Sequence, residues 1–134
     1  MSISGTVIGV DSSTQSCKVM VVDAATGQIL SRGSAPHPDG TSVDPREWTK
    51  ALNQAWDAAG ARGRSDVLGV GVSAQQHGMV ALDSAGAPVH DALLWNDVRS
   101  APQARAMVEE LGISGWVEAT GSAPVTSITL TKLA

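Results

Sequence analysis

The sequence predicts an α/β domain in which a mixed β-sheet is flanked by helices. Three observations predict it: three short apolar runs joined by turns near the N-terminus, an amphipathic helix after them, and a fourth apolar run beyond that helix. Successive runs joined by short turns pair as an antiparallel meander, and an apolar helical stripe packs on a sheet face. We therefore expect one sheet with a helix lying on it.

The first three strands are marked by their apolar residues and by the turns between them. Residues 6–10 (TVIGV), 17–23 (CKVMVVD) and 29–35 (ILSRGSA) are the three runs. Gly27, in the segment between the second and third runs, permits the positive φ that a tight turn requires. These runs are expected to form the meander.

A well-marked helix start follows a loop that is rich in Pro and Gly. Asp44 is expected to be the N-cap, Pro45 the first helical residue and Glu47 the partner that completes a capping box. Apolar residues then recur at steps of three and four until a stop near residues 60–63. This apolar stripe consists of Trp48, Ala51, Leu52, Ala55, Trp56 and Ala59.

The second half of the chain mixes short strands with helices. Residues 67–74 (VLGVGVSA) are apolar throughout, which predicts a central strand covered on both faces. Residues 79–89 suggest a strand running into a turn, and residues 92–95 a further short strand. Helical spacing over residues 100–111 predicts a helix that stops at Gly112, with a shorter helical piece after it.

Composition and charge exclude several classes of function. The 134 residues suffice for one domain, and the net charge of −4 comes with nine scattered Lys and Arg. Without a basic stripe, nucleic acid is not expected as a partner. No apolar run approaches the roughly 18 residues of a membrane helix. The single cysteine, Cys17, suits a reducing compartment, so we expect a soluble, cytoplasmic protein.

The first candidate site is the segment GVDSSTQSCKV, residues 9–19. Lys18 would supply positive charge to a phosphate, and Asp11 would hold a magnesium ion through water. The GxxxxGK[ST] pattern of a Walker loop is absent. The alternative is a hairpin whose hydroxyl groups cap their own backbone. The residues that offer hydroxyl and backbone N–H groups to the phosphate are Ser12, Ser13 and Thr14.

The second candidate site is the segment SAQQHGM, residues 73–79. Gln76 and His77 would lie at the end of a strand, on the rim of a sheet, where α/β folds commonly bind ligands. Several donors and acceptors together suit a polyhydroxylated ligand such as a sugar. The alternative is a capped strand end with a hydrogen-bonded core histidine.

A third segment, LLWNDVRSA, supplies possible support for the sugar site. Asp97 and Arg99 are expected to form an ion pair that anchors a loop, and Trp95 either flanks a sugar pocket or lies in the core. Cys17 is expected to be a buried small hydrophobe. His37 is assigned to a polar loop without a metal-ligand spacing.

Taken in order along the whole chain, these motifs resemble the N-terminal part of the FGGY carbohydrate kinases, most closely the xylulokinases. The matching blocks are GVDSSTQSCKVMVVDAATGQ, DPREW, SAQQHGMVALD and LLWNDVRSAPQA. Glycerol kinases of this family typically carry an Arg-Glu pair at Gln76 and His77, which favours a ketopentose substrate here. Ser13 stands where the wider superfamily usually has Gly, which puts the backbone phosphate contacts at that position in question.

The resemblance implies a ribonuclease H-like fold of the actin-like ATPase type, with two domains that close over ATP and sugar. It implies transfer of the γ-phosphoryl group of ATP to D-xylulose, giving D-xylulose 5-phosphate, with Mg²⁺. Asp11 would be the acid needed for activity, residues 12–14 and Lys18 would line the phosphate loop, and Gln76 with His77 would hold the sugar.

The resemblance also bears on the extent of the chain. Residues 125–134 begin a periodic element without a cap or turn after it, so we expect residues 1–134 to be the first part of a truncated kinase N-terminal domain. The resemblance implies that the general base lies beyond residue 134, so the chain alone is expected to be inactive. We also expect the parent protein to be a homodimer. The alternatives are another FGGY kinase (for ribulose, gluconate or glycerol), another actin-like ATPase, or a non-catalytic sugar-binding fragment.

Overall fold

The computed structural model describes residues 4–134, which form two compact units. The first unit holds the described residues up to Asp39 together with Asp44–Gln75, and the second holds Gly40–Val43 together with Gln76–Ala134. Each unit is therefore built from two stretches that are separate in the sequence.

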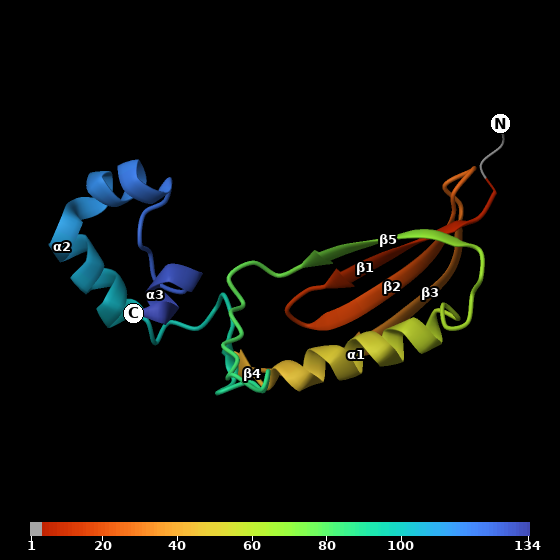
Figure 1. Cartoon of the computed structure of the whole chain (residues 1–134), viewed down its shortest axis with the longest axis horizontal. Coiled ribbons are helices and arrows are strands. Elements are labelled where there is room, and N and C mark those ends of the chain that lie inside the picture. The colour runs from red at the N-terminus through yellow and green to blue at the C-terminus, as the bar shows by residue number, and fades with distance from the viewer. Residues whose placement is uncertain (1–3) are drawn as a thin grey trace. The chain divides into compact units, whose positions relative to one another are not determined.

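A four-stranded mixed sheet forms the centre of the first unit (Figure 1). Its strands are β1 (Thr6–Ser12), β2 (Ser16–Asp23), β3 (Ile29–Pro36) and β5 (Val67–Ala74), in the order β3-β2-β1-β5. The β1-β2 and β2-β3 pairs are antiparallel, and β5 joins β1 in parallel. The predicted meander and the mixed sheet are confirmed.

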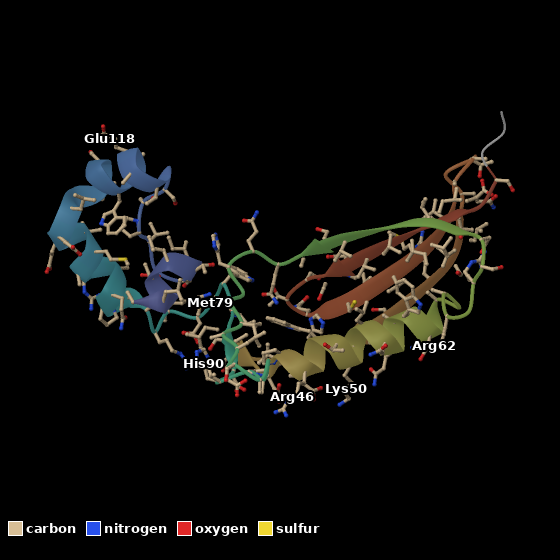
Figure 2. All side chains as sticks on the ribbon, viewed as in Figure 1. Arg46, Lys50, Arg62, Met79, His90 and Glu118 are labelled. Atoms are coloured by element: carbon tan, nitrogen blue, oxygen red, sulfur yellow. The ribbon has the colours of Figure 1, made fainter. Side chains whose placement is uncertain are left out.

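Helix α1 (Pro45–Ala58) lies on one face of this sheet, against β2 and β3. Asp44 is the N-cap, because its carboxylate accepts a hydrogen bond of 2.9 Å from the backbone N–H of Arg46. The predicted capping box is wrong: the Glu47 carboxylate pairs instead with Lys50 Nζ at 3.2 Å. Figure 2 shows Arg46 and Lys50 pointing away from the sheet.

The core of the first unit lies between α1 and the sheet and is made of small and branched side chains. Alternate residues of a strand share one face, so every second residue of β2 faces the helix. Small side chains remove little apolar area from water, so this core depends on short distances between its elements. The buried residues are Ile8, Val10, Cys17, Val19, Val21, Ala35, Ala51, Ala55, Ala59 and Ala61.

Gly33 on β3 marks a close approach of the helix to the sheet. A methyl group at this position would lie 2.0 Å from the Ala55 carbonyl oxygen and 2.4 Å from the Ala59 nitrogen. Two residues earlier on the same strand, Ser31 Oγ donates to the Ala59 carbonyl at 2.6 Å. Strand β3 and the end of α1 therefore meet backbone against backbone.

Strand β5 lies at the edge of the described sheet, so its predicted central position is wrong. Leu68, Val70 and Val72 are 57%, 51% and 71% exposed. Val70 and Val72 line an apolar hollow together with Trp48 and Trp56 of α1. An apolar run indicates that a strand tolerates cover on both faces, but it does not specify which elements provide that cover.

The second unit contains a short ribbon and two helices. Strand β4 (Ser42–Val43) pairs antiparallel with β6 (Ala92–Leu93), and the helices are α2 (Ala101–Thr120) and α3 (Thr129–Leu133). The predicted break at Gly112 is confirmed, because its φ of 72° and ψ of 160° kink α2 at this point. Within residues 4–134, no helix has the length and apolar character to cross a membrane.

The segment 79–89 forms a turn and isolated bridges, so the strand predicted there is wrong. The Asp83 carboxylate accepts hydrogen bonds of 2.9 Å from the backbone N–H groups of Ala85 and Ala87. Because Asp83 satisfies these backbone donors locally, they are not available to a strand ladder. The predicted turn is confirmed.

Replacing Gly33 with alanine is expected to destabilise the chain. Helix α1 would have to move away from β3, since the atoms that a methyl group would meet belong to the backbone. Overpacking of this kind costs roughly 1–3 kcal/mol, and more where the backbone cannot yield. The measurement is urea unfolding of the Gly33→Ala chain. The matched control is Gly9→Ala on β1, where a methyl group meets nothing within 4 Å. Equal losses in the two variants would contradict the close-contact explanation.

Candidate functional site

Asp11 and Lys18 lie near the turn where β1 leads into β2. They are direct cross-strand partners, and Lys18 Nζ lies 3.5 Å from Asp11 Oδ2. The side chains are 47% exposed for Asp11 and 54% exposed for Lys18. An ion pair this exposed is weak, so both groups are accessible to a ligand.

The turn of this hairpin is closed by Ser13. Both its backbone N–H, at 3.1 Å, and its hydroxyl, at 3.3 Å, donate to the carbonyl oxygen of Ser16. The backbone-capping alternative therefore holds for this hydroxyl. Among the described residues other than glycine, positive φ occurs at His77 and Ser127, so Ser13 does not adopt the conformation that would favour glycine. The hydroxyl residues predicted to contact a phosphate are all partly buried: Ser12, Ser13 and Thr14.

His37 holds the hairpin in place, a role that the sequence analysis missed. The residue lies in the loop directly after β3, as predicted, but it is buried, with 7% exposed. Its Nδ1 lies 2.9 Å from the Ser13 carbonyl oxygen, and its backbone N–H donates to the Gln15 carbonyl at 2.9 Å. Because a carbonyl oxygen only accepts, Nδ1 carries the proton. His37 thus holds two carbonyl groups of the turn, those of Ser13 and Gln15.

Cys17 is buried, as predicted. Burial raises the pKa of its thiol and the negative charge of Asp11 raises it further, against a smaller lowering by Lys18. A thiol whose pKa is raised is a poor nucleophile near neutral pH. Cys17 therefore belongs to the core, although it lies on β2 close to the hairpin turn.

Gln76 and His77 lie in the turn that follows β5 in the chain, and both are exposed. The alternative of a core histidine is therefore wrong. His77 has a φ of 60°, which is uncommon for a residue with a Cβ atom. Its carbonyl oxygen accepts from Lys132 Nζ at 2.5 Å, and its Nδ1 lies 3.5 Å from Thr129 Oγ1. The imidazole and the amide are open to a ligand.

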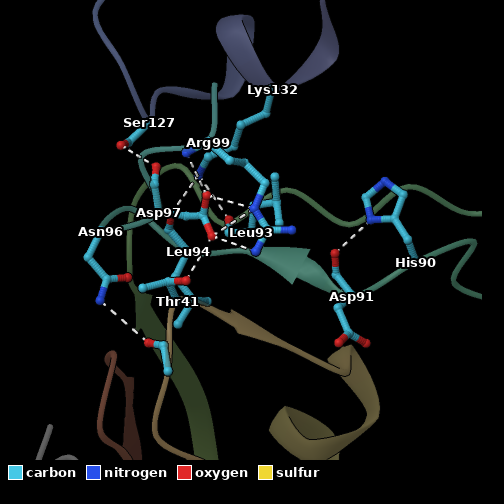
Figure 3. A network of polar contacts seen from close by, with 11 residues as sticks. Thr41, His90, Asp91, Leu93, Leu94, Asn96, Asp97, Arg99, Ser127 and Lys132 are labelled. Carbon is cyan, nitrogen blue, oxygen red and sulfur yellow. Dashed lines mark hydrogen bonds and ion pairs between the residues drawn. The ribbon is translucent and has the colours of Figure 1, made fainter. Parts of the chain in front are cut away.

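Asp97 and Arg99 form the predicted ion pair within a larger network (Figure 3). Arg99 Nη2 lies 2.9 Å from Asp97 Oδ2, and the same oxygen accepts from Thr41 Oγ1 at 2.8 Å. Burial raises the pKa of Asp97, but hydrogen bonds from the Arg99 backbone, the Arg99 side chain and Thr41 lower it overall. The Asp97 carboxylate, 3% exposed, anchors the loop, whereas Trp95 is 54% exposed and lies outside the core.

The candidate metal-binding group predicted from the sequence is Asp11 alone. Across residues 4–134, no group of three or more His, Cys, Asp and Glu side chains is arranged to hold a metal ion. Asp11 is a single carboxylate beside a lysine. Magnesium usually keeps several waters and takes one or two carboxylates together with substrate phosphates. A single carboxylate such as Asp11 could therefore contribute to a magnesium site only together with ligands from elsewhere.

The residues predicted from the sequence fall into two groups in the structure. Asp11, residues 12–14 and Lys18 belong to the first unit, where one hairpin brings them together. Gln76, His77 and the loop that contains Asp97 belong to the second unit. The residues predicted to contact phosphate thus belong to the first unit, and those predicted to contact a sugar belong to the second.

Residues 6–134 match the N-terminal domain of the FGGY family of carbohydrate kinases. The chain belongs to this family. Its membership confirms the resemblance seen in the sequence motifs.

A curated relative and solved structures support this assignment. The xylulose kinase of Streptomyces coelicolor is 53% identical over 133 residues, covering 96% of this chain and 27% of that protein. The crystal structure of xylulose kinase from Bifidobacterium adolescentis has a TM-score of 0.91 and 49% identity, covering 98% of this chain and 29% of that chain. The FGGY chain thus has the ribonuclease H-like fold of the actin-like ATPases, as predicted.

The likeness in fold reaches further than the likeness in sequence. The structure of Plasmodium falciparum glycerol kinase with ADP has a TM-score of 0.82 at 20% identity, covering 96% of this chain and 28% of that chain. This second likeness supports the fold alone. In each of these comparisons the FGGY chain spans less than a third of the relative's length.

Removing the imidazole of His37 is expected to loosen the hairpin and destabilise the chain. His37→Leu keeps most of the volume but leaves the Ser13 carbonyl without its donor, at a cost of about 1–3 kcal/mol. His37→Asn places an amide N–H near the former Nδ1 and should recover part of the loss. The measurement is the free energy of unfolding in urea. A His37→Leu chain as stable as the original would show that the contact contributes nothing.

Proposed function

We propose that the full protein to which this chain belongs transfers the γ-phosphoryl group of ATP to D-xylulose, giving D-xylulose 5-phosphate. The observation that carries the proposal is the 53% identity, across 96% of the chain, to a protein named xylulose kinase. We also propose that residues 1–134 form the first part of the kinase N-terminal domain, with the rest of that domain and a C-terminal domain after them. The exposed apolar strand β5 is consistent with such further cover.

In this proposal the β1-β2 hairpin receives the phosphates of ATP. Phosphoryl transfer depends mostly on positioning and on stabilisation of negative charge. Lys18 supplies a cation at the hairpin, and Asp11 holds Mg²⁺, brought by the nucleotide, through water. The hydroxyl and N–H groups of residues 12–14 are the further donors. His37 keeps the turn that carries them in one conformation.

The sugar is assigned to the exposed turn and loop of the second unit. Gln76 offers an amide and His77 an imidazole, which together supply donors and acceptors for sugar hydroxyls. Trp95, which is 54% exposed, offers an apolar ring surface for the carbon face of a sugar. The Asp97–Arg99 pair gives support rather than contact, because the Asp97 carboxylate is already saturated by Thr41 and Arg99.

Kinase activity is tested in a chimera in which this chain replaces the matching segment of the Streptomyces coelicolor xylulose kinase. We expect the chimera to phosphorylate D-xylulose with ATP, and Asp11→Asn to lower its kcat by roughly 100-fold or more, as loss of a charge-positioning group does. The control is Asp39→Asn, which changes an exposed carboxylate in the loop after β3. A chimera that folds but does not phosphorylate D-xylulose would overturn the proposed function.

If Gln76 and His77 bind the sugar, loss of the His77 side chain should change KM for D-xylulose and not KM for MgATP. In the chimera, His77→Ala should raise KM for D-xylulose by roughly two- to tenfold, the range for one lost hydrogen bond, and change KM for MgATP little. His90→Ala is the matched control, since His90 is also exposed and belongs to the same unit. An unchanged KM for D-xylulose would remove His77 from the site.

A further inference from the structure

Lys132 of helix α3 has its side-chain ammonium group on three backbone carbonyl oxygens. Lys132 Nζ lies 2.5 Å from the carbonyl oxygen of His77, 2.9 Å from that of Leu93 and 2.9 Å from that of Leu94. Figure 3 shows the side chain reaching Leu93 and Leu94. A lysine ammonium has three N–H donors and no acceptor, so these carbonyls use its full donor capacity. Lys132 therefore has no donor left for a ligand.

The three carbonyls come from two segments that are far apart in the sequence and carry all the candidate sugar contacts. The carbonyl of His77 belongs to the turn that presents Gln76 and His77. The carbonyls of residues 93–94 directly precede Trp95 and the Asp97 loop. One side chain thus joins the two stretches of backbone from which the sugar contacts would project.

A second contact from the same C-terminal region supports this arrangement. Ser127 Oγ donates to the Asp97 carbonyl oxygen at 2.5 Å, five residues before Lys132 (Figure 3). The segment 127–132 therefore binds backbone carbonyls on both sides of Trp95. The loop is held at Leu94 and again at Asp97, and the two residues between these anchors, Trp95 and Asn96, are fixed with them.

The backbone at His77 needs such support. Its φ of 60° is a left-handed conformation that costs a residue with a Cβ atom of order 1 kcal/mol or more and persists only where surrounding contacts enforce it. Hydrogen bonds from a charged donor are roughly twice as strong as those between neutral groups. The contact from Lys132 Nζ is thus well suited to enforce this conformation.

We propose that Lys132 is a positioning residue for the sugar site: it fixes the His77 turn relative to the loop after β6 without touching the sugar. The inference rests on the proposed function, because it assumes that these segments bind the sugar. It predicts that loss of the ammonium group weakens sugar binding and leaves the nucleotide side, which lies in the other unit, largely unchanged.

The kinetic experiment compares Lys132→Met with Lys50→Met in the chimera. Methionine keeps the length of the side chain and removes the charge, and Lys50 is an exposed lysine of α1 paired with Glu47. Lys132→Met should raise KM for D-xylulose about tenfold and KM for MgATP less than twofold, whereas Lys50→Met should change neither. Equal rises in both constants, or a fall in kcat alone, would overturn the proposal.

A second measurement separates this inference from the proposed function. Amide hydrogen exchange in the 134-residue chain needs no activity, and Lys132→Met should accelerate exchange in the peptides around residues 76–79 and 93–97 at least several-fold. Unchanged exchange would overturn the positioning role even if the chimera is an active kinase. If exchange is accelerated but the chimera without substitutions is inactive, the proposed function is wrong, and so is the effect of Lys132 on KM for D-xylulose.

A milder substitution guards against a variant that does not fold. Lys132→Arg keeps the charge but spreads its donors over a planar fork, which does not converge on three carbonyls as an ammonium does. Lys132→Arg should also raise KM for D-xylulose more than KM for MgATP, but by a smaller factor than Lys132→Met. A Lys132→Arg chimera with the KM for D-xylulose of the original would mean that the three-carbonyl geometry does not matter, and the proposal would fail.

Discussion

The close approach of helix α1 to strand β3 at Gly33 is the constraint on which the first unit depends. The sequence has no Phe or Tyr, so its core is filled mainly by Val, Ile and Ala, which remove enough apolar area only when the layers lie close together. Gly33 allows that distance, and the Ser31 hydroxyl joins the two backbones beside it. Because β2 packs under the same helix and continues into the hairpin, the packing of the core also positions Asp11 and Lys18.

In both candidate sites, a side chain donates hydrogen bonds to backbone carbonyl groups. In the first unit, His37 donates to the carbonyl of Ser13, and in the second, Lys132 donates to three carbonyls beside the proposed sugar contacts. In each case a partly or fully buried side chain satisfies acceptors of irregular backbone, which would otherwise rely on water.

Local patterns in the sequence predicted most elements but not their surroundings. The meander, the N-cap at Asp44 and the break at Gly112 follow from spacing and turn chemistry within a few residues, and the structure confirms them. The prediction that β5 is a central strand was wrong, because an apolar run does not specify which strands pair with it. The contacts of His37 and Lys132 join residues 24 and 55 positions apart, and no local pattern indicates them.

The fold alone does not select the sugar. The structure of a glycerol kinase shares the fold of this chain at 20% identity, and one fold can carry sites for different substrates. If Lys132 and Ser127 fix the backbone frame through carbonyl groups, the frame is independent of the side chains that project from it. Under the proposed function, selection among sugars would then be left to Gln76, His77 and their neighbours on the exposed turn. A family built this way can change substrate by exchanging ligand-facing side chains, while the residues that hold the backbone stay as they are.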